Sequence, residues 1–378
     1  MADRSLDSNS KIYPLTSVRF LAALYVVLEH GRGVVPLLSA GTAYVRQFMS
    51  LGYIAVNFFF VLSGYILAVV YLQGKPAVNR RNFWLARFAR IYTIFVVALL
   101  LDLPHFIHIW LSRHALGVAQ PPIWATVGMN LLLLQSWWTR FLGLNDPGWS
   151  LSTEAFFYAL FPFVGALLWR LRTRGAVAWA LIIYLAGNAA VLFFIGRPVE
   201  LAALRYNPAS HLYEFLLGIL TARLHFILQE NPRRTRWLRG AAPWLLAACV
   251  GTYLAIVPWT TLLPLQLLAH GIFSPLFCAA LLALASGNVG VNKIFSAAWS
   301  VLLGEASYSL YLIHVPIFFM LRLPLEKYGG PLFLVYVCLC IGLSVLSYLY
   351  IEKPSRRWIL RKWGVRSRES EAAAAVAQ

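Results

Sequence analysis

Three ionisable residues stand in the first apolar segment of the chain, which runs from Ser17 to Gly31 and reads SVRFLAALYVVLEHG. Arg19 and His30 are eleven positions apart, and Glu29 directly precedes His30. In a helix of about 100° and 1.5 Å per residue, this spacing puts both side chains on one face, roughly 16 Å apart. Histidine can take a proton from a hydroxyl near neutral pH, and ionisable groups inside an apolar span are costly. The pair therefore predicts a functional site within a membrane.

The same residues also fit a purely structural interpretation. Arg19 could extend to the cytoplasmic surface of the membrane, and Glu29, His30 and Gly31 could simply end the helix. Because Glu29 is adjacent to His30, its side chain should point about 100° away in a regular helix. We therefore expect the partner of His30 to come from another segment.

Glu154 is the candidate for that partner. It lies in the first turn of the apolar run NDPGWSLSTEAFFYALFP, beside Ser150, Ser152 and Thr153. Serine, threonine and glutamate at a helix start are also an ordinary capping pattern. Because a carboxylate can orient a histidine or accept a proton, we expect Glu154 to act with His30.

Two further apolar runs carry polar groups at helical spacing. NPASHLYEFLLGIL places His211 and Glu214 on one helix face, and GEASYSLYLIHVP carries Glu305, Tyr311 and His314. A single histidine in a helix is more often structural than catalytic. Polar groups that converge from several segments favour a site.

A basic stretch, RRNFWLARFARIYTIF, leads directly into the third apolar run. Arg87 and Arg90 share a helix face, and with Arg81 they offer guanidinium groups suited to phosphate oxygens. Membrane topology and anionic lipid headgroups explain the same arginines without a ligand. In the preceding run, Ser63 and Gly64 suit either helix packing or the close approach of a ligand.

Composition predicts an all-α polytopic membrane protein. Of the 378 residues, 60% are apolar and 12% charged, and the mean hydropathy is +0.69. The net charge of +18 comes from short basic clusters between apolar runs, which argues against nucleic-acid binding. The four cysteines lie in apolar runs and indicate neither disulfides nor a metal site.

Ten segments are long and apolar enough to span a bilayer. They lie near residues 15–34, 50–72, 84–104, 150–170, 176–195, 209–228, 242–259, 262–286, 299–321 and 331–351. With both termini in the cytoplasm, 24 of the 32 lysines and arginines fall on the cytoplasmic side. This bias favours ten spans over eleven and makes the apolar stretch 122–138 a re-entrant or interfacial segment.

The predicted domain organisation is simple. Residues 1–14 form a cytoplasmic tail without a signal peptide, 15–352 form the membrane domain, and 353–378 form a basic cytoplasmic tail, partly disordered.

The motifs together resemble the acyltransferase-3 family of integral membrane O-acyltransferases. They are Arg19-x10-His30, FFFVLSGY (58–65), RFARIY (87–92), GWSLSTEAFFY (148–158), EFLLG (214–218), SYSLYLIHVP (307–316) and IEKP (351–354). The resemblance covers residues 11–358, nearly the whole chain.

The resemblance implies transfer of an acyl group, usually acetyl, from cytoplasmic acyl-CoA to an extracytoplasmic hydroxyl. The acceptor is most often a glycan, free or lipid-linked, at the bacterial inner membrane. Acyl-CoA is then a substrate, and we expect no permanently bound cofactor or metal. Without a soluble domain, a separate extracytoplasmic partner protein could complete the transfer.

The resemblance also implies roles for individual residues. His30, Glu154 and Arg19 are the catalytic candidates, and Arg81, Arg87, Arg90, Ser63 and Gly64 the acyl-CoA-binding ones. Acceptor-side or supporting candidates are Trp149, Ser150, Ser152, Tyr158, His211, Glu214, Tyr311 and His314. Two positions depart from the family pattern: Asn57 stands where members often have aspartate, and His211 where they often have arginine.

Two other classes of protein share some of these features. A secondary transporter or flippase equally needs intramembrane arginine, glutamate and histidine, but should show an internal repeat and paired broken helices. A non-catalytic scaffold of envelope glycan synthesis would need neither His30 nor CoA.

Overall fold

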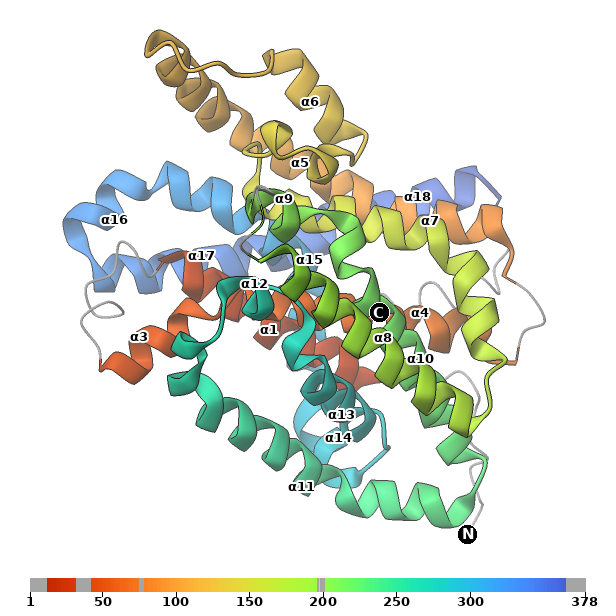
Figure 1. Ribbon diagram of the computed structural model, residues 1–378. Helices are drawn as coiled ribbons and strands as arrows, with labels where there is room; N and C mark the ends of the chain where they lie inside the picture. The colour runs from red at the N-terminus through yellow and green to blue at the C-terminus, as the bar shows by residue number, and fades with distance from the viewer. Residues whose placement is uncertain (1–11, 32–41, 75–77, 196, 198–200, 365–378) are drawn as a thin grey trace.

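The computed structural model describes residues 12–31, 42–74, 78–195, 197 and 201–364. Every regular element within these ranges is a helix, as predicted. Helices α1 (Tyr13–Gly31) and α4 (Ile54–Leu72) lie in the middle of the molecule, and the other long helices surround them (Figure 1). Of the predicted cytoplasmic tails, 1–14 and 353–378, residues 1–11 and 365–378 lie outside the described residues.

Eight helices of the described chain are long and apolar enough to cross a membrane, or nine if one bent pair counts as a span. They are α4, α5 (Arg80–Ala115), α7 (Trp149–Trp169), α8 (Thr173–Phe194), α10 (Leu212–Gln229), α11 (Pro232–Ile256), α15 (Ala298–Met320) and α17 (Gly330–Ser347). The bent pair joins η6 (Gly271–Phe273) and α13 (Ser274–Leu284) to α14 (Val289–Phe295) at 100°. The chain is therefore a multi-pass membrane protein.

The predicted number of ten spans differs from this set for two physical reasons. Helix α1 has 19 residues, but its polar groups, Arg19 and Glu29 among them, lower its mean hydropathy. The predicted span 262–286 is not one helix, because α12 (Leu265–Leu268) and η6 interrupt it. The exact number of crossings stays a prediction.

The apolar stretch 122–138, which we predicted to be re-entrant or interfacial, contains no helix of spanning length. It forms α6 (Ile123–Leu131), which at 1.5 Å per residue is about 14 Å long, and the short turn η1 (Gln135–Trp137). With the end of α5, α6 forms a projection from the bundle (Figure 1). None of its residues lines the central cavity described below.

The polar residues of the stretch 122–138 instead hold the start of α7. Gln135 Nε2 donates to the Gly148 carbonyl at 2.8 Å, and Ser136 Oγ donates to the Trp149 carbonyl at 2.7 Å. Ser152 of α7 returns a bond to the Leu133 carbonyl at 2.6 Å. The turns η2 (Thr139–Phe141) and η3 (Asp146–Gly148) complete this connection. The position of α7 is therefore fixed by side-chain bonds to a neighbouring segment.

Glycines bring the central helices into backbone contact. A Cβ on Gly64 of α4 would meet the carbonyl oxygen of Phe215 in α10, and one on Gly218 of α10 would meet that of Val61. Gly304 of α15 lies equally close to the Thr16 carbonyl of α1. Such close crossings are how helices associate in lipid, where burial of apolar surface gives little driving force.

The last helix bends where it leaves the bundle. A π-helical turn, η7 (Tyr348–Glu352), connects α17 to α18 (Lys353–Lys362), which packs against α5 through Ile359 and Leu360. Such turns rotate the following residues relative to a regular helix. The remaining short helices are α3 (Ala43–Ser50), α9 (Leu201–Tyr206), η4 (Pro208–His211), η5 (Val257–Leu262) and α16 (Arg322–Tyr328).

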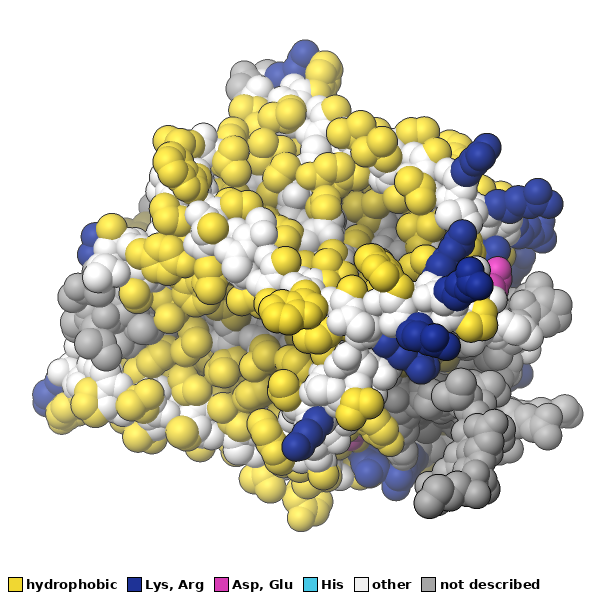
Figure 2. Space-filling view, turned by 90° about the horizontal axis from the view of Figure 1, so that it is seen from below, with side chains coloured by type: hydrophobic (Ala, Val, Ile, Leu, Met, Phe, Trp, Pro, Cys, Tyr) yellow, Lys and Arg dark blue, Asp and Glu magenta, His cyan; other side chains and the backbone are white. Residues whose placement is uncertain are grey.

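One face of the molecule is covered mainly by apolar side chains, while most of the visible lysines and arginines gather at one side (Figure 2). This distribution suits helices surrounded by lipid, with basic residues at one surface of the bilayer.

We predict that Gly64→Ala destabilises the bundle by about 1–3 kcal/mol, because the new methyl group forces α4 away from α10. Thermal unfolding of the detergent-solubilised protein measures this. Gly251→Ala in α11 is the control, since its Cβ would meet open space, and its effect should be at most about 1 kcal/mol, in the stabilising direction. Equal behaviour of the two variants would contradict the assigned helix crossing.

Candidate functional site

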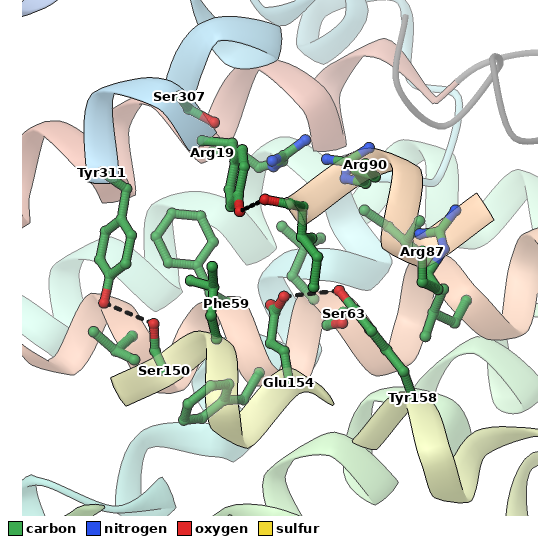
Figure 3. Close-up of a pocket in the computed structure, with 18 residues that line it drawn as sticks. Arg19, Phe59, Ser63, Arg87, Arg90, Ser150, Glu154, Tyr158, Ser307 and Tyr311 are labelled. Atoms are coloured by element: carbon green, nitrogen blue, oxygen red, sulfur yellow. Dashed lines mark hydrogen bonds between the residues drawn. The ribbon is translucent and has the colours of Figure 1, made fainter. Parts of the chain in front are cut away.

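A cavity lies between five helices at the centre of the bundle, and Figure 3 shows the side chains that line it. It holds about 750 Å³ of empty space, its open mouth included. The polar side chains that line it are Arg19, Ser63, Arg87, Arg90, Ser150, Glu154, Tyr158, Ser307, Tyr308 and Tyr311. Five separate helices thus bring together eight of the residues singled out in the sequence.

Positive charge gathers at one end of this cavity. Arg19 and Arg87 are only 8% and 4% exposed, and Arg90 lies beside them (Figure 3). Glu154 points into the same space and accepts a hydrogen bond from Tyr158 Oη at 2.7 Å. All three arginines are close enough to Glu154 to act on its charge. Since buried ions need nearby counter-charges, Glu154 helps to hold this arginine cluster in place.

Two residues that sequence reasoning did not select belong to the same cluster. Glu352 is buried at the end of the π-helical turn and accepts a hydrogen bond from Ser309 Oγ at 3.0 Å. Arg356 in α18 is also buried, and it acts electrostatically on Glu352, Arg87 and Arg90. We had placed Arg356 in a basic tail, but the structure packs α18 against α5 instead. The motif IEKP was the available signal for Glu352.

Tyrosine and serine hydroxyls close the other end of the cavity. Tyr311 Oη lies 2.9 Å from Ser150 Oγ and donates to the Pro147 carbonyl at 3.3 Å. Tyr308, by contrast, lies at the arginine end, where its Oη donates to the carbonyl of Ile91, the residue after Arg90, at 2.6 Å. Tyr311 thus forms a wall between the arginine end and the residues beyond it (Figure 3).

His30 lies beyond this wall and does not line the cavity. Its Nδ1 is 2.9 Å from the Val26 carbonyl and 3.3 Å from Glu29 Oε2, and its side chain is 30% exposed. The expectation that Glu29 points away from His30 was therefore wrong, because both side chains bend toward each other. Glu154, which we expected to orient His30, bonds to Tyr158 instead.

His314 fills the space between Tyr311 and His30. Its ring meets the His30 ring edge-on at 5.0 Å between centroids, and the Tyr311 ring at 6.2 Å. Its Nδ1 lies 2.8 Å from the Tyr311 carbonyl, while its buried Nε2 has no hydrogen-bond partner within the described chain. A carbonyl can only accept, so Nδ1 carries the proton and Nε2 is a buried free acceptor. Tyr311, His314 and His30 thus form a continuous row.

His211 and Glu214 belong to a second buried cluster, outside the cavity. His211 Nδ1 is 3.1 Å from Glu214 Oε1, and the His211 ring stacks on that of His270 at 4.6 Å. Asn57 Nδ2 donates to the His270 carbonyl at 2.6 Å. The two departures from the family pattern, Asn57 and His211, therefore both contact His270, a residue that sequence reasoning missed because no local pattern surrounds it.

The remaining candidates fall in different places. Ser63 lines the cavity, whereas Gly64 faces α10 and serves the helix crossing. Arg81 lies outside the cavity, in a surface depression beside Trp84 and Trp363. Trp149 packs between Phe60, Tyr206 and His211. Within the described residues, no group of three or more histidine, cysteine or acidic side chains is arranged to hold a metal.

Comparison with known proteins identifies one family. The acyltransferase domain family matches residues 12–352. "Acyltransferase MdmB" of Streptomyces mycarofaciens is 32% identical, over 84% of this chain and 81% of that protein. "Putative peptidoglycan O-acetyltransferase YrhL" of Bacillus subtilis is 27% identical, over 81% of this chain and 50% of that protein. "Putative O-acetyltransferase SACOL0978" of Staphylococcus aureus is 24% identical, over 91% of this chain and 57% of that protein.

This chain thus spans about half the length of the Bacillus and Staphylococcus relatives. No solved structure matches it significantly.

We predict that Glu352→Ala lowers the free energy of unfolding by about 3–5 kcal/mol, because it leaves the buried arginines without one of their counter-charges. Thermal or denaturant unfolding in detergent measures the loss. Glu326→Ala is the matched control: Glu326 pairs with Arg322 at 2.8 Å on the surface, and such pairs contribute about 1 kcal/mol at most. Similar losses in both variants would show that Glu352 does not stabilise the cluster.

Proposed function

Because this chain belongs to the acyltransferase family that matches residues 12–352, we propose that it moves an acetyl group from cytoplasmic acetyl-CoA to a carbohydrate hydroxyl. The chain is a membrane O-acyltransferase. The donor, the acceptor and the residue roles that follow are our proposal, as is the location in the bacterial inner membrane.

The excess of positive charge at one end of the cavity supports an anionic donor. Four arginines gather there, Arg19, Arg87, Arg90 and Arg356, around the two carboxylates of Glu154 and Glu352. A net positive charge in an apolar environment is costly, so the excess of arginines over carboxylates favours a ligand that supplies negative charge. The phosphates of acyl-CoA do so, and guanidinium groups suit their oxygens. This is the observation that carries the proposal.

The cavity gives the rest of the donor a path. The pantetheine arm of CoA is long and thin, and in our proposal it follows the apolar walls of α4 and α15 from the arginines toward Tyr311. For transfer at His30, the thioester end has to pass Ser150 and Tyr311 and reach His314, whose side chain lies between Tyr311 and His30. Arg19 holds a phosphate at the arginine end.

In this scheme His30 is the general base. The Val26 carbonyl accepts the Nδ1 proton of His30, which leaves the lone pair of Nε2 for the acceptor. The hydroxyl gives its proton to Nε2, its oxygen bonds to the acyl carbon and the carbon–sulfur bond breaks. The CoA thiolate then takes the proton from the imidazolium. Glu29, 3.3 Å from Nδ1, stabilises the imidazolium between these steps.

A relay through a covalent acyl-histidine is the other route for the same residues. The two routes differ in kinetics, since only the relay releases CoA before an acceptor binds.

The relatives favour a carbohydrate acceptor. The name of the Bacillus relative, "Putative peptidoglycan O-acetyltransferase", supports this acceptor. We propose a glycan, free or lipid-linked, that reaches the His30 end directly or through a separate extracytoplasmic protein.

We predict that Arg87→Gln raises the dissociation constant for acetyl-CoA about tenfold or more, because one charge-assisted contact to phosphate is lost. Binding of radiolabelled acetyl-CoA to the protein in nanodiscs measures this. Arg113→Gln, at the exposed far end of the same helix, is the control and should leave the affinity unchanged. Equal affinities for all three proteins would place the donor elsewhere.

We predict that His30→Ala lowers acyl transfer about 10²–10⁴-fold while acetyl-CoA still binds, since only the base is removed. The assay follows CoA release and transfer of label to a pool of envelope glycans. His108→Ala changes an exposed histidine of α5 and should retain full activity. A fully active His30→Ala protein would overturn this mechanism, and the absence of thioester turnover in wild type with every glycan would overturn the function.

A further inference from the structure

A second, larger hollow lies on the outside of the bundle, between α8 and α10. It holds about 1200 Å³ of empty space, including its open side. One face of α8 forms one wall, from Ile183 through Ala186 and Ala190 to Phe194. Leu212 and Leu216 of α10 form part of the other wall. Its lining is almost entirely apolar, and the small side chains of α8 leave it open along about 16 Å of helix.

This groove faces the membrane. Only 11% of the most apolar part of α8 is buried, the lowest share among the spanning helices of the described chain. Helix α8 lies on the outside of the bundle beside α10 (Figure 1). Apolar walls that face lipid favour contact with hydrocarbon, because a polar group placed there would lose its hydrogen bonds to water.

One end of the groove leads to the candidate site. Its end is formed by Leu204, Asn207 and Ser210, from α9 and η4. The next residue, His211, contacts the rings of Phe60 and Trp149, and Phe60 lines the central cavity. A single layer of side chains therefore separates the groove from the cavity.

The same short segment presents an arginine beside that layer. Arg205 lies over the rings of Tyr53 and Tyr206, 5.4 Å from each centroid, and Tyr206 packs on Trp149. No carboxylate of the described chain forms an ion pair with Arg205. A half-exposed guanidinium in this setting suits a phosphate oxygen.

We propose that the groove binds the hydrocarbon chain of a lipid-linked acceptor, a single-chain lipid phosphate whose head lies at Arg205. The apolar walls of α8 and α10 suit a hydrocarbon chain, and Arg205, beside the end of the groove, suits its phosphate. The sugar on such a lipid then reaches the Trp149 and His30 end of the site from within the membrane. The inference rests on the proposed function and adds the class of acceptor.

The test uses the whole protein in phosphatidylcholine nanodiscs with a polyprenyl phosphate that carries a photoactivatable diazirine on its chain. Mass spectrometry locates the crosslinks. We expect them on α8 and α10 in wild type. Ala190→Trp fills the groove and should lower this labelling about tenfold. Leu185→Trp, on the lipid-facing side of α8 and outside the groove, should leave it unchanged. Arg205→Gln should weaken labelling, because the phosphate loses its partner.

Competition separates an acceptor lipid from bulk lipid. Unlabelled polyprenyl phosphate should displace the probe, and phosphatidylglycerol at the same concentration should not. Equal displacement by phosphatidylglycerol, or full labelling of Ala190→Trp, would overturn the proposal. Because crosslinking requires no acyl transfer, a failure of this proposal can be distinguished from a failure of the proposed function.

Discussion

The burial of several arginines in an apolar bundle is the constraint on which the rest of this structure depends. Arg19, Arg87 and Arg356 are each less than a tenth exposed, and a lone ion in such surroundings is very costly. Glu154 and Glu352 offset part of that cost, and a local structural feature positions each carboxylate. Glu154 sits on a helix whose start is held by Gln135 and Ser136, and Glu352 stands at the end of a π-helical turn.

Close helix crossings make the arrangement rigid. The glycines of α4, α10 and α15 bring backbones into contact, so α1, α4, α10 and α15 have little freedom to shift. Tyr308 ties α15 to α5 through the Ile91 carbonyl, and Tyr311 ties it to the start of α7. The arginines and hydroxyl groups that line the cavity are therefore held at fixed positions along it, which is the condition for positioned catalysis. The row from Tyr311 through His314 to His30 then connects the cavity to the end of α1 where His30 lies.

Local patterns in the sequence predicted much of this. Apolar length predicted the helices, and the bias in positive charge singled out 122–138, which contains no helix of spanning length. Residue type and spacing led to Arg19, Glu154, Arg87 and Arg90, which the structure brings into one cavity. The partner of His30 was missed because the side chain of Glu29 bends toward it, which helix geometry alone does not reveal. Arg356 and His270 were missed because their neighbours come from distant helices. Gly64 lies at a helix crossing, and a glycine that admits a ligand and one that admits a helix look alike in sequence.

The central claim is that donor and acceptor enter one path from opposite ends, the donor through the arginine cluster and the acceptor past His30. The most direct test is to determine from which side of the membrane each substrate enters. Proteoliposomes in which the protein has one orientation would receive radiolabelled acetyl-CoA outside and contain the glycan acceptor inside. The account predicts that label accumulates on the enclosed glycan when the arginine end faces outward, and that vesicles of the other orientation transfer nothing. Transfer only when donor and acceptor share one side of the membrane would contradict it.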